Sequence, residues 1–241
     1  MLTKTKGIVL HRIKYGETSV ITHVYTEVFG RQSYLVRGVR SKNSKNRANL
    51  LQPLSLLDME VYYREKRELQ KLKEIVNRTP FISIPYNMVK SSIALFLAEI
   101  LYKTLKEEEP NPGLFEYLDN SIKLLDIKES KCVNFHFSFL IHLSNHLGFF
   151  PQLNFSEKNR YFDLQNGKFV SVTPLHPYFL SDKISALLYK FGNQSFENNE
   201  LIKMDYQTHQ ELLENILIYY SLHISGMGKI KSYKILKEVF H

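Results

Sequence analysis

The highest density of positive charge in the sequence is a run of eleven residues, 37–47, with five cations and no acidic residue. The cations are Arg37, Arg40, Lys42, Lys45 and Arg47. Arginine pairs with phosphate through a planar fork of N–H groups, whereas lysine acts more as a point charge. The serine, asparagine and glycine residues between these cations are typical of a loop. The run therefore predicts a mobile loop that contacts phosphates.

Charge is distributed unevenly along the 241 residues. Residues 1–80 contain 16 basic and seven acidic residues, including eight of the nine arginines, whereas residues 81–241 contain 16 basic and 17 acidic residues. The net charge of +8 thus arises entirely in the first third of the chain. Such asymmetry indicates a polyanionic partner, most often nucleic acid. A basic surface that serves only solubility is the alternative.

Hydrophobic periodicity predicts strands in this basic part of the chain. Alternating patterns rich in β-branched residues occur near residues 7–13, 20–26, 32–39, 56–63 and 69–76. A sheet of this size leaves exposed edges unless it closes into a barrel. The sequence therefore predicts a five-stranded OB-fold barrel over residues 1–80, with five tyrosines among its residues on which bases can stack.

After Pro80 the apolar residues recur every three or four positions, which predicts helices. The expected helices cover residues 89–105, 113–125, 133–147, 182–191 and 206–224. Between them, two short apolar stretches flank Asn166-Gly167, a strong signal for a β-hairpin. The predicted fold class is α+β with two domains, the second spanning residues 81–241, mostly helical, with a small hairpin near residues 160–172.

Several classes of protein are disfavoured by the motifs and composition. The sequence contains no nucleophile elbow, His-Glu-x-x-His motif, dinucleotide fingerprint or complete phosphate loop, so we expect no enzyme and no cofactor. Cys132 is the only cysteine, which fits a reducing compartment. No apolar run approaches the roughly 20 residues that span a bilayer, so we expect a cytoplasmic protein without membrane contact.

Eight short motifs occur in a characteristic order. They are Gly7-Ile-Val-Leu, Tyr15-Gly-Glu-Thr, Tyr25-Thr, Phe29-Gly, Arg37-Gly-Val-Arg-Ser-Lys, Leu50-Leu-Gln-Pro-Leu, Leu147-Gly-Phe-Phe-Pro-Gln-Leu and Lys229-Ile-Lys-Ser. Over nearly the full length, this arrangement resembles the RecO family of DNA repair and recombination mediator proteins. The resemblance implies an N-terminal OB-fold followed by a helical domain, the same organisation that the periodicity indicates.

The resemblance also implies a function and partners. Members of this bacterial family bind single- and double-stranded DNA, anneal complementary strands and act at the nucleoid. With a RecR partner, they help load the RecA recombinase onto strands coated by single-stranded-DNA-binding protein. The short acidic and hydrophobic tail of that coating protein is the ligand implied for the helical domain.

Together, the local charge and the family resemblance give a set of candidate DNA-binding residues. Arg37, Arg40, Lys42, Lys45 and Arg47 are expected to hold phosphates, helped by Arg12 and Arg31, and Tyr15 is expected to stack on a base. Many family members also carry a four-cysteine zinc knuckle after the Leu-Gly-Phe-x-Pro segment, but residues 154–172 contain no cysteine. We therefore expect no metal, and a hairpin that folds through packing of Tyr161, Phe162 and Phe169 on the helices.

Two rival interpretations remain open. The same barrel could be an RNA-binding module of translation or RNA processing, since such a groove tolerates either sugar. A nucleic-acid enzyme could instead use Glu17, Asp58 and Glu60 as metal ligands, although carboxylates at strand ends are more often surface groups.

Overall fold

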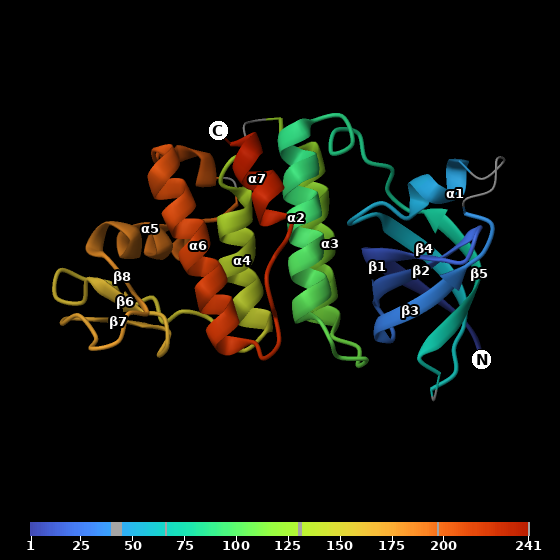
Figure 1. The fold of residues 1–241 in the computed structure, drawn as a ribbon, viewed down its shortest axis with the longest axis horizontal. Helices are drawn as coiled ribbons and strands as arrows, with labels where there is room; N and C mark the ends of the chain where they lie inside the picture. The colour runs from blue at the N-terminus through green and yellow to red at the C-terminus, as the bar shows by residue number, and fades with distance from the viewer. Residues whose placement is uncertain (40–44, 66, 130–131, 197, 241) are drawn as a thin grey trace. The chain divides into compact units, whose positions relative to one another are not determined.

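The computed structural model describes residues 1–39, 45–65, 67–129, 132–196 and 198–240 (Figure 1). The chain forms two compact units, the first comprising Met1–Ile127 and Ile230–Tyr233 and the second Lys128–Lys229 and Lys234–His241. The change from strands to helices near residue 80 lies inside the first unit, which combines the barrel with two helices and a short C-terminal segment.

Five strands of the first unit close into a barrel in the order β1-β2-β3-β5-β4, which confirms the predicted OB-fold. The strands are β1 (Leu2–Tyr15), β2 (Ser19–Thr26), β3 (Gly30–Val36), β4 (Leu56–Tyr62) and β5 (Leu69–Asn77). Neighbours pair antiparallel except β3 and β5, which pair in parallel over only three residues. Alternation along the strands places one set of side chains in the core, including Val9, Val24, Tyr34, Met59 and Val61.

A short helix, α1 (Lys45–Leu50), follows β3 in the chain. The expectation of a loop through Arg47 is therefore wrong for its last three residues. Ala48 and Leu50 pack against the barrel core, and Leu51 is fully buried in it. Because these apolar contacts are tertiary, the polar composition of residues 40–47 did not indicate a helix.

Two helices complete the first unit, α2 (Met88–Thr104) and α3 (Pro112–Ile127). The N-cap residue of α2, Asn87, accepts a hydrogen bond from the backbone N–H of Lys90 (3.1 Å). The link from β5 to α2 is fixed by Asp126 of α3, whose carboxylate accepts backbone N–H groups of Ile82, Ser83 and Ile84 at 2.8–2.9 Å. These helices are thus held rigidly to the connection that leaves the barrel.

The second unit is mostly helical and includes a small sheet, as predicted. Its elements are α4 (Phe135–His146), β6 (Tyr161–Asp163), β7 (Lys168–Val170), β8 (Phe179–Leu180), α5 (Asp182–Asn193), the 3-10 helix η1 (Asn199–Leu201), α6 (Tyr206–His223) and, from its second residue onward, α7 (Tyr233–Val239). The sheet order is β7-β6-β8, so the predicted hairpin gains a third strand. Within the described ranges, no helix has the length and apolar character needed to cross a membrane.

Aromatic packing holds this sheet on the helices. The rings of Phe162 and Phe169 lie 4.9 Å apart, Phe162 contacts Tyr219 of α6 at 5.5 Å, and Phe169 contacts Tyr189 of α5 at 6.2 Å. The ring of Tyr161 contacts that of Phe179 in β8. The predicted packing on the helices is therefore confirmed for Phe162 and Phe169.

Candidate nucleic-acid interface

The outer face of the barrel carries a row of aliphatic side chains that crosses three strands. Ile13 of β1 lies opposite Ile21 of β2, and Ile21 lies opposite Leu35 of β3. Residues opposite one another in paired strands project from the same face of a sheet. Leu35 is in turn aligned with Lys71 of β5, so the row ends in a cation. Ile13 is 44% exposed, and Ile21 and Leu35 are half-buried, which leaves the row accessible to a ligand.

A second row lies beside the first. Tyr15 is opposite Ser19, and Val20 is opposite Val36, so Arg37 comes next to Ser19 at the end of β3. Alternation then places Tyr15 and Arg37 on the same outer face as the aliphatic row. Tyr15 is 52% exposed and Arg37 is exposed. The face therefore combines an aliphatic surface, an exposed aromatic ring and cations.

The other end of this outer face is covered by α2. Tyr102 of α2 contacts the rings of His11 and His23, with centroids 4.6 and 5.0 Å away. Burial, together with the nearby positive charge of Arg31, lowers the pKa of His23 to about 4, so this ring is neutral at pH 7. Burial likewise lowers the pKa of His11. The open part of the face thus begins beyond these two histidines, at the aliphatic row.

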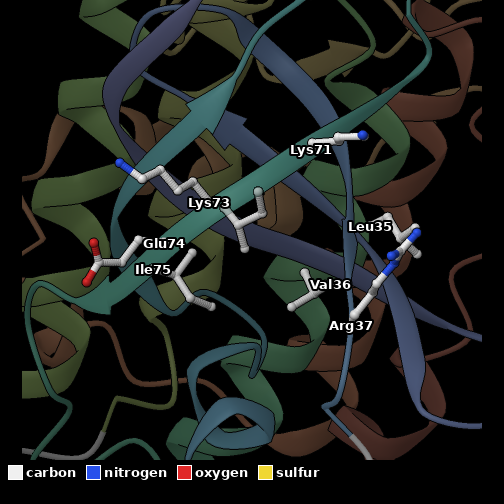
Figure 2. Close-up of a pocket in the computed structure, with 8 residues that line it drawn as sticks. Leu35, Val36, Arg37, Lys71, Lys73, Glu74 and Ile75 are labelled. Carbon is white, nitrogen blue, oxygen red and sulfur yellow. The ribbon is translucent and has the colours of Figure 1, made fainter.

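A cleft opens where β3 and β5 separate, next to the aliphatic row (Figure 2). Its volume is about 400 Å³. The lining residues are Leu35, Val36, Arg37, Lys71, Leu72, Lys73, Glu74 and Ile75. Figure 2 shows Leu35, Arg37 and Lys71 toward one end of the cleft and Lys73 and Glu74 toward the other. The rim is therefore mainly cationic, whereas Val36, Leu72 and Ile75 belong to the barrel core or pack against it.

The structure brings some of the predicted site residues together. Arg37 and Tyr15 lie on the open face, as described above. The guanidinium of Arg12 donates a hydrogen bond to the carbonyl oxygen of Ala48 in α1 (3.1 Å). The backbones of Lys45 and Arg47 belong to this same short helix, so Arg12 lies beside the helix that contains the end of the basic run 37–47. Arg40 and Lys42 lie outside the described residues.

Arg31 is separate from this group. It lies six residues before Arg37 on β3, about 20 Å along an extended strand. Its guanidinium donates hydrogen bonds to the carbonyl oxygens of Tyr102 (3.0 Å) and Leu105 (2.9 Å) at the C-terminal end of α2. The residue therefore has a structural role, whether or not it also contacts phosphate.

Lys71 and Lys73 extend the basic face beyond the residues that the sequence analysis selected. Both are exposed residues of β5. In the sequence they lie more than 20 residues after the basic run 37–47. The alternation of lysine with apolar residues in β5 predicts only an exposed strand face. The parallel pairing of β3 with β5, which local sequence patterns do not reveal, places Lys71 beside Leu35.

Two of the three carboxylates of the rival nuclease hypothesis lie close to cations. Glu60 forms an ion pair with Lys73 (2.8 Å), and Asp58 lies 3.9 Å from Arg78. Glu17 lies in the turn between β1 and β2. In the part of the chain that the structure describes, no group of three or more His, Cys, Asp or Glu side chains could hold a metal ion. The geometry therefore offers no support for a metal-dependent nuclease there.

A closed five-stranded barrel of this order, with an open basic outer face, defines the class of OB-fold proteins, which bind oligonucleotides on the face of the second and third strands. Two family profiles match the chain. The profile described as Recombination protein O N terminal covers residues 1–81, and that described as Recombination protein O C terminal covers residues 85–234. The chain belongs to the RecO family of DNA repair proteins.

Individual relatives agree with this assignment. The chain is 42% identical over 241 residues to the DNA repair protein RecO of Bacteroides fragilis, 39% identical over 240 residues to that of Azobacteroides pseudotrichonymphae and 30% identical over 244 residues to that of Porphyromonas gingivalis. In each comparison, the alignment covers 100% of both chains. The resemblance stated from short motifs is thereby confirmed.

Proposed function

We propose that this protein is a DNA-binding recombination mediator that holds single strands on the outer face of its barrel and anneals complementary strands. The observation that carries the proposal is the cross-strand row Ile13–Ile21–Leu35, which ends at Lys71 and lies beside Tyr15 and Arg37. Exposed aromatic and aliphatic side chains contact bases, and the surrounding cations neutralise phosphates. Membership of a DNA repair family favours DNA over RNA as the ligand.

Annealing follows from the charge. Two complementary strands repel each other through their phosphates, and a basic surface that neutralises part of this charge lowers the repulsion. The candidate phosphate contacts are Arg37, Arg40, Lys42, Lys45 and Arg47, together with Arg12, which is hydrogen-bonded to Ala48 of α1, and Arg31 at the far end of β3. No catalytic step and no cofactor are part of this proposal.

Fluorescence anisotropy of a labelled single-stranded DNA oligonucleotide across a salt series tests DNA binding. Five phosphate contacts predict a slope of log affinity against log salt of about −3.5, since each contact with a single strand contributes about −0.7. A variant with Arg37, Arg40, Lys42, Lys45 and Arg47 changed to alanine should lose most of this slope. An affinity that does not respond to salt would contradict the proposal.

Two further assays separate the rival functions. Competition with an RNA oligonucleotide of matched sequence should leave most of the labelled DNA bound, whereas stronger binding of the RNA would support an RNA-binding module. Incubation of labelled DNA with the protein and magnesium should give no cleavage product. Cleavage that is lost in a Glu60→Gln variant would instead support the nuclease hypothesis.

A surface of the second unit suits the acidic tail of the single-stranded-DNA-binding protein. A pocket of about 510 Å³ between α5 and the start of α6 has Lys183, Lys190 and Lys203 around apolar groups of Ala186, Leu187 and Met204. Cations beside apolar side chains complement a peptide that is both acidic and hydrophobic. We propose that the tail binds there, and that the protein acts with RecR in loading RecA; membership of the family supports this part of the proposal.

Binding of a labelled acidic, hydrophobic peptide measures this partner site directly. Lys190→Glu and Lys203→Glu should each lower the affinity for the peptide by about tenfold, because each replaces an attractive charge with a repulsive one. Lys168→Glu, on β7 outside the pocket, is the matched control and should bind the peptide like the parent protein. Equal losses in all three variants would indicate that only net charge matters and would refute this site.

A further inference from the structure

The cleft between β3 and β5 suggests how the bases of a bound strand are held. We propose that it accepts one unpaired nucleobase of a single strand lying across the outer face, with Arg37 and Lys71 on the adjacent phosphates. This inference rests on the proposed function, because it assumes that the barrel binds a nucleic acid strand. It adds a base-binding site formed in part by β5, a strand that no candidate residue from the sequence analysis occupies.

The first supporting feature is the short ladder between β3 and β5. The parallel pairing covers Ser33 with Leu69, Tyr34 with Gln70 and Leu35 with Lys71, and it ends there. β5 continues to Asn77, and among the described strands it is paired there with β4 alone, on its other side. From Leu72 onward, the edge of β5 that faces β3 therefore presents backbone N–H and C=O groups that no strand in the described part of the chain pairs with.

Such an edge is chemically suited to a base. Every nucleobase carries hydrogen-bond donors or acceptors along its edges, and a strand edge offers both kinds of group in alternation. Pairing with backbone groups needs no particular side chain, so it tolerates different bases. A site of this kind fits a protein that must bind strands of any sequence.

The second feature is the local irregularity of β5. Glu60 pairs with Glu74 and Val61 pairs with Leu72, so Lys73 is the extra residue of a β-bulge. Bulges bend a strand and redirect side chains, and they are frequent beside functional sites. Here the bulge exposes Lys73 and Glu74 in succession at one end of the cleft, and Leu72 and Ile75 remain half-buried.

The third feature is the combination of volume, floor and charge. About 400 Å³ lies within the range of about 300–1,000 Å³ typical of small-molecule sites. The apolar side chains of Val36, Leu72 and Ile75 provide surfaces against which the flat face of a base can pack. Lys71 is exposed, and within the described ranges it forms no ion pair, so its charge is available to a phosphate.

Charge complementarity thus favours a nucleotide over an uncharged apolar ligand. Three cations, Arg37, Lys71 and Lys73, line the cleft together with one acidic residue, Glu74. The Lys73 charge is largely matched by Glu60 at 2.8 Å. Arg37 and Lys71 lie toward the other end of the cleft, and we assign the phosphates to that end. Because a paired base cannot leave its duplex without losing its partner, the site selects single strands over duplexes.

The test compares two eight-nucleotide strands by anisotropy, one with abasic sites throughout and one that carries a single thymine at its centre. Both have the same phosphates, so their affinity ratio measures the contribution of one base. All measurements use a Tyr15→Ala background, which removes stacking on that ring. The thymine should raise the affinity at least about fivefold, the lower limit for a bound base.

Two substitutions of one residue then locate the base. In the same background, Leu72→Phe fills the cleft and should abolish the gain from thymine, so that the two strands bind with an affinity ratio of about one. Leu72→Met, which conserves volume, should retain the gain. A gain that persists in the Leu72→Phe variant, or that is already absent in the Tyr15→Ala protein, would overturn the inference.

A measurement without a substitution in the cleft covers the case in which Leu72→Phe does not fold. The single thymine is replaced by fluorescent 2-aminopurine, and acrylamide quenching is compared between free and bound strands in the Tyr15→Ala protein. A base in the cleft should be shielded, and equal quenching of both would overturn the inference. If the two strands bind equally with a steep salt slope, the proposed function stands without this site, whereas salt-insensitive binding of both contradicts the proposed function itself.

Discussion

The guanidinium of Arg31 joins the barrel to the C-terminal end of α2. The last carbonyl groups of a helix lack partners within the helix, and a cation there interacts favourably with the helix dipole. Arg31 supplies hydrogen-bond donors to the carbonyl oxygens of Tyr102 and Leu105, and it places a cation at this end of the helix. Its guanidinium also lies 4.5 Å from the centre of the Tyr102 ring. The residue therefore stabilises the first unit independently of any ligand.

We expect Arg31→Ala to lower the free energy of unfolding by about 1.5–3 kcal/mol, the usual range for hydrogen bonds that involve a charged group. Urea unfolding followed by circular dichroism measures this change. Lys71→Ala is the control, because an exposed side chain without an ion pair should shift stability by less than about 0.5 kcal/mol. Equal stability of Arg31→Ala and the parent protein would refute the structural role.

His23 makes the stability of the first unit depend on pH. Its pKa is about 4 in the folded state, because the ring is partly buried and lies near the charges of Arg31 and His11. In the unfolded chain the pKa returns to about 6.5, so between these values the unfolded state binds more protons. Stability should therefore fall as the pH drops from 6.5 toward 4, by about 1–2 kcal/mol after allowance for the partial exposure of the ring.

Urea unfolding between pH 7.5 and pH 4.5 tests this dependence. The surroundings of His23 also include Ser33, which lies 2.9 Å from its Nδ1, and Tyr102 of α2, while Glu99 acts on neighbouring His11. A His23→Gln variant should show a shallower loss of stability with acid than the parent protein. If both lose stability equally, other histidines with lowered pKa values, such as His136 and His209, account for the effect.

At the scale of the elements, the turn between β2 and β3 fits closely against the segment that follows α2. Gly30, the first residue of β3, has a φ of +58°, and a Cβ at this position would overlap the carbonyl oxygen of Glu109 and lie 2.8 Å from that of Glu107. The N–H of Arg31 donates a hydrogen bond to the same Glu107 oxygen (3.0 Å). The glycine is thus required both by its backbone conformation and by this close approach.

Substituting alanine at two glycines separates these requirements. Gly16 in the β1–β2 turn has a similar φ of +62°, but nothing lies within 4 Å of its added Cβ. Gly16→Ala should cost about 1 kcal/mol from backbone strain alone, and Gly30→Ala should cost at least about 1 kcal/mol more. Thermal unfolding of the two variants measures the difference, and equal costs would show that the segment after α2 yields easily.

The turn of the small sheet in the second unit is held by hydrogen bonds to one buried carboxylate. The carboxylate of Asp163 accepts the backbone N–H groups of Gln165 and Asn166 and the side-chain amide of Asn166 at 2.7–3.1 Å. These bonds fix the turn, and the buried rings of Phe162 and Phe169 fix the strands. These hydrogen bonds and rings therefore stabilise the sheet.

Metal removal should accordingly leave this sheet intact. We expect EDTA to leave the thermal unfolding midpoint unchanged. Asp163→Ala should lower the free energy of unfolding by about 1–3 kcal/mol, because the turn loses three hydrogen bonds to this carboxylate. A lower midpoint in EDTA, restored by added zinc, would contradict the expectation that the sheet needs no metal.

Elements with a strong local pattern were predictable from the sequence, whereas those formed by tertiary contacts were not. Alternation located all five barrel strands, but the polar start of α1 concealed a helix that packs on the core through Ala48 and Leu50. β8 has two residues, too few for a periodicity. In the candidate site, Arg37 and Tyr15 were selected from sequence, but Lys71 was not, because its position depends on the pairing of β5 with β3.

At the scale of the whole molecule, the chain returns to its first unit near the C-terminus. Residues Ile230–Tyr233 belong to the same unit as the barrel, more than 100 residues after Ile127. The carboxylate of Glu99 in α2 accepts the backbone N–H groups of Lys231 (2.9 Å) and Ser232 (2.7 Å) and the Ser232 hydroxyl (2.6 Å). Burial raises the pKa of Glu99, but these hydrogen bonds outweigh it and lower the pKa below its usual value.

This arrangement gives a structural reason for the Lys229-Ile-Lys-Ser motif, and it predicts how the segment is held. Glu99→Gln replaces one accepting oxygen with a donor, so the amides of Lys231 and Ser232 should exchange with deuterium about tenfold faster, equivalent to about 1.4 kcal/mol. Lys103→Gln is the control, because Lys103 lies 3.6 Å from Glu99 and makes none of these three bonds. Unchanged exchange in Glu99→Gln would mean that packing, and not this carboxylate, holds the C-terminal segment to the first unit.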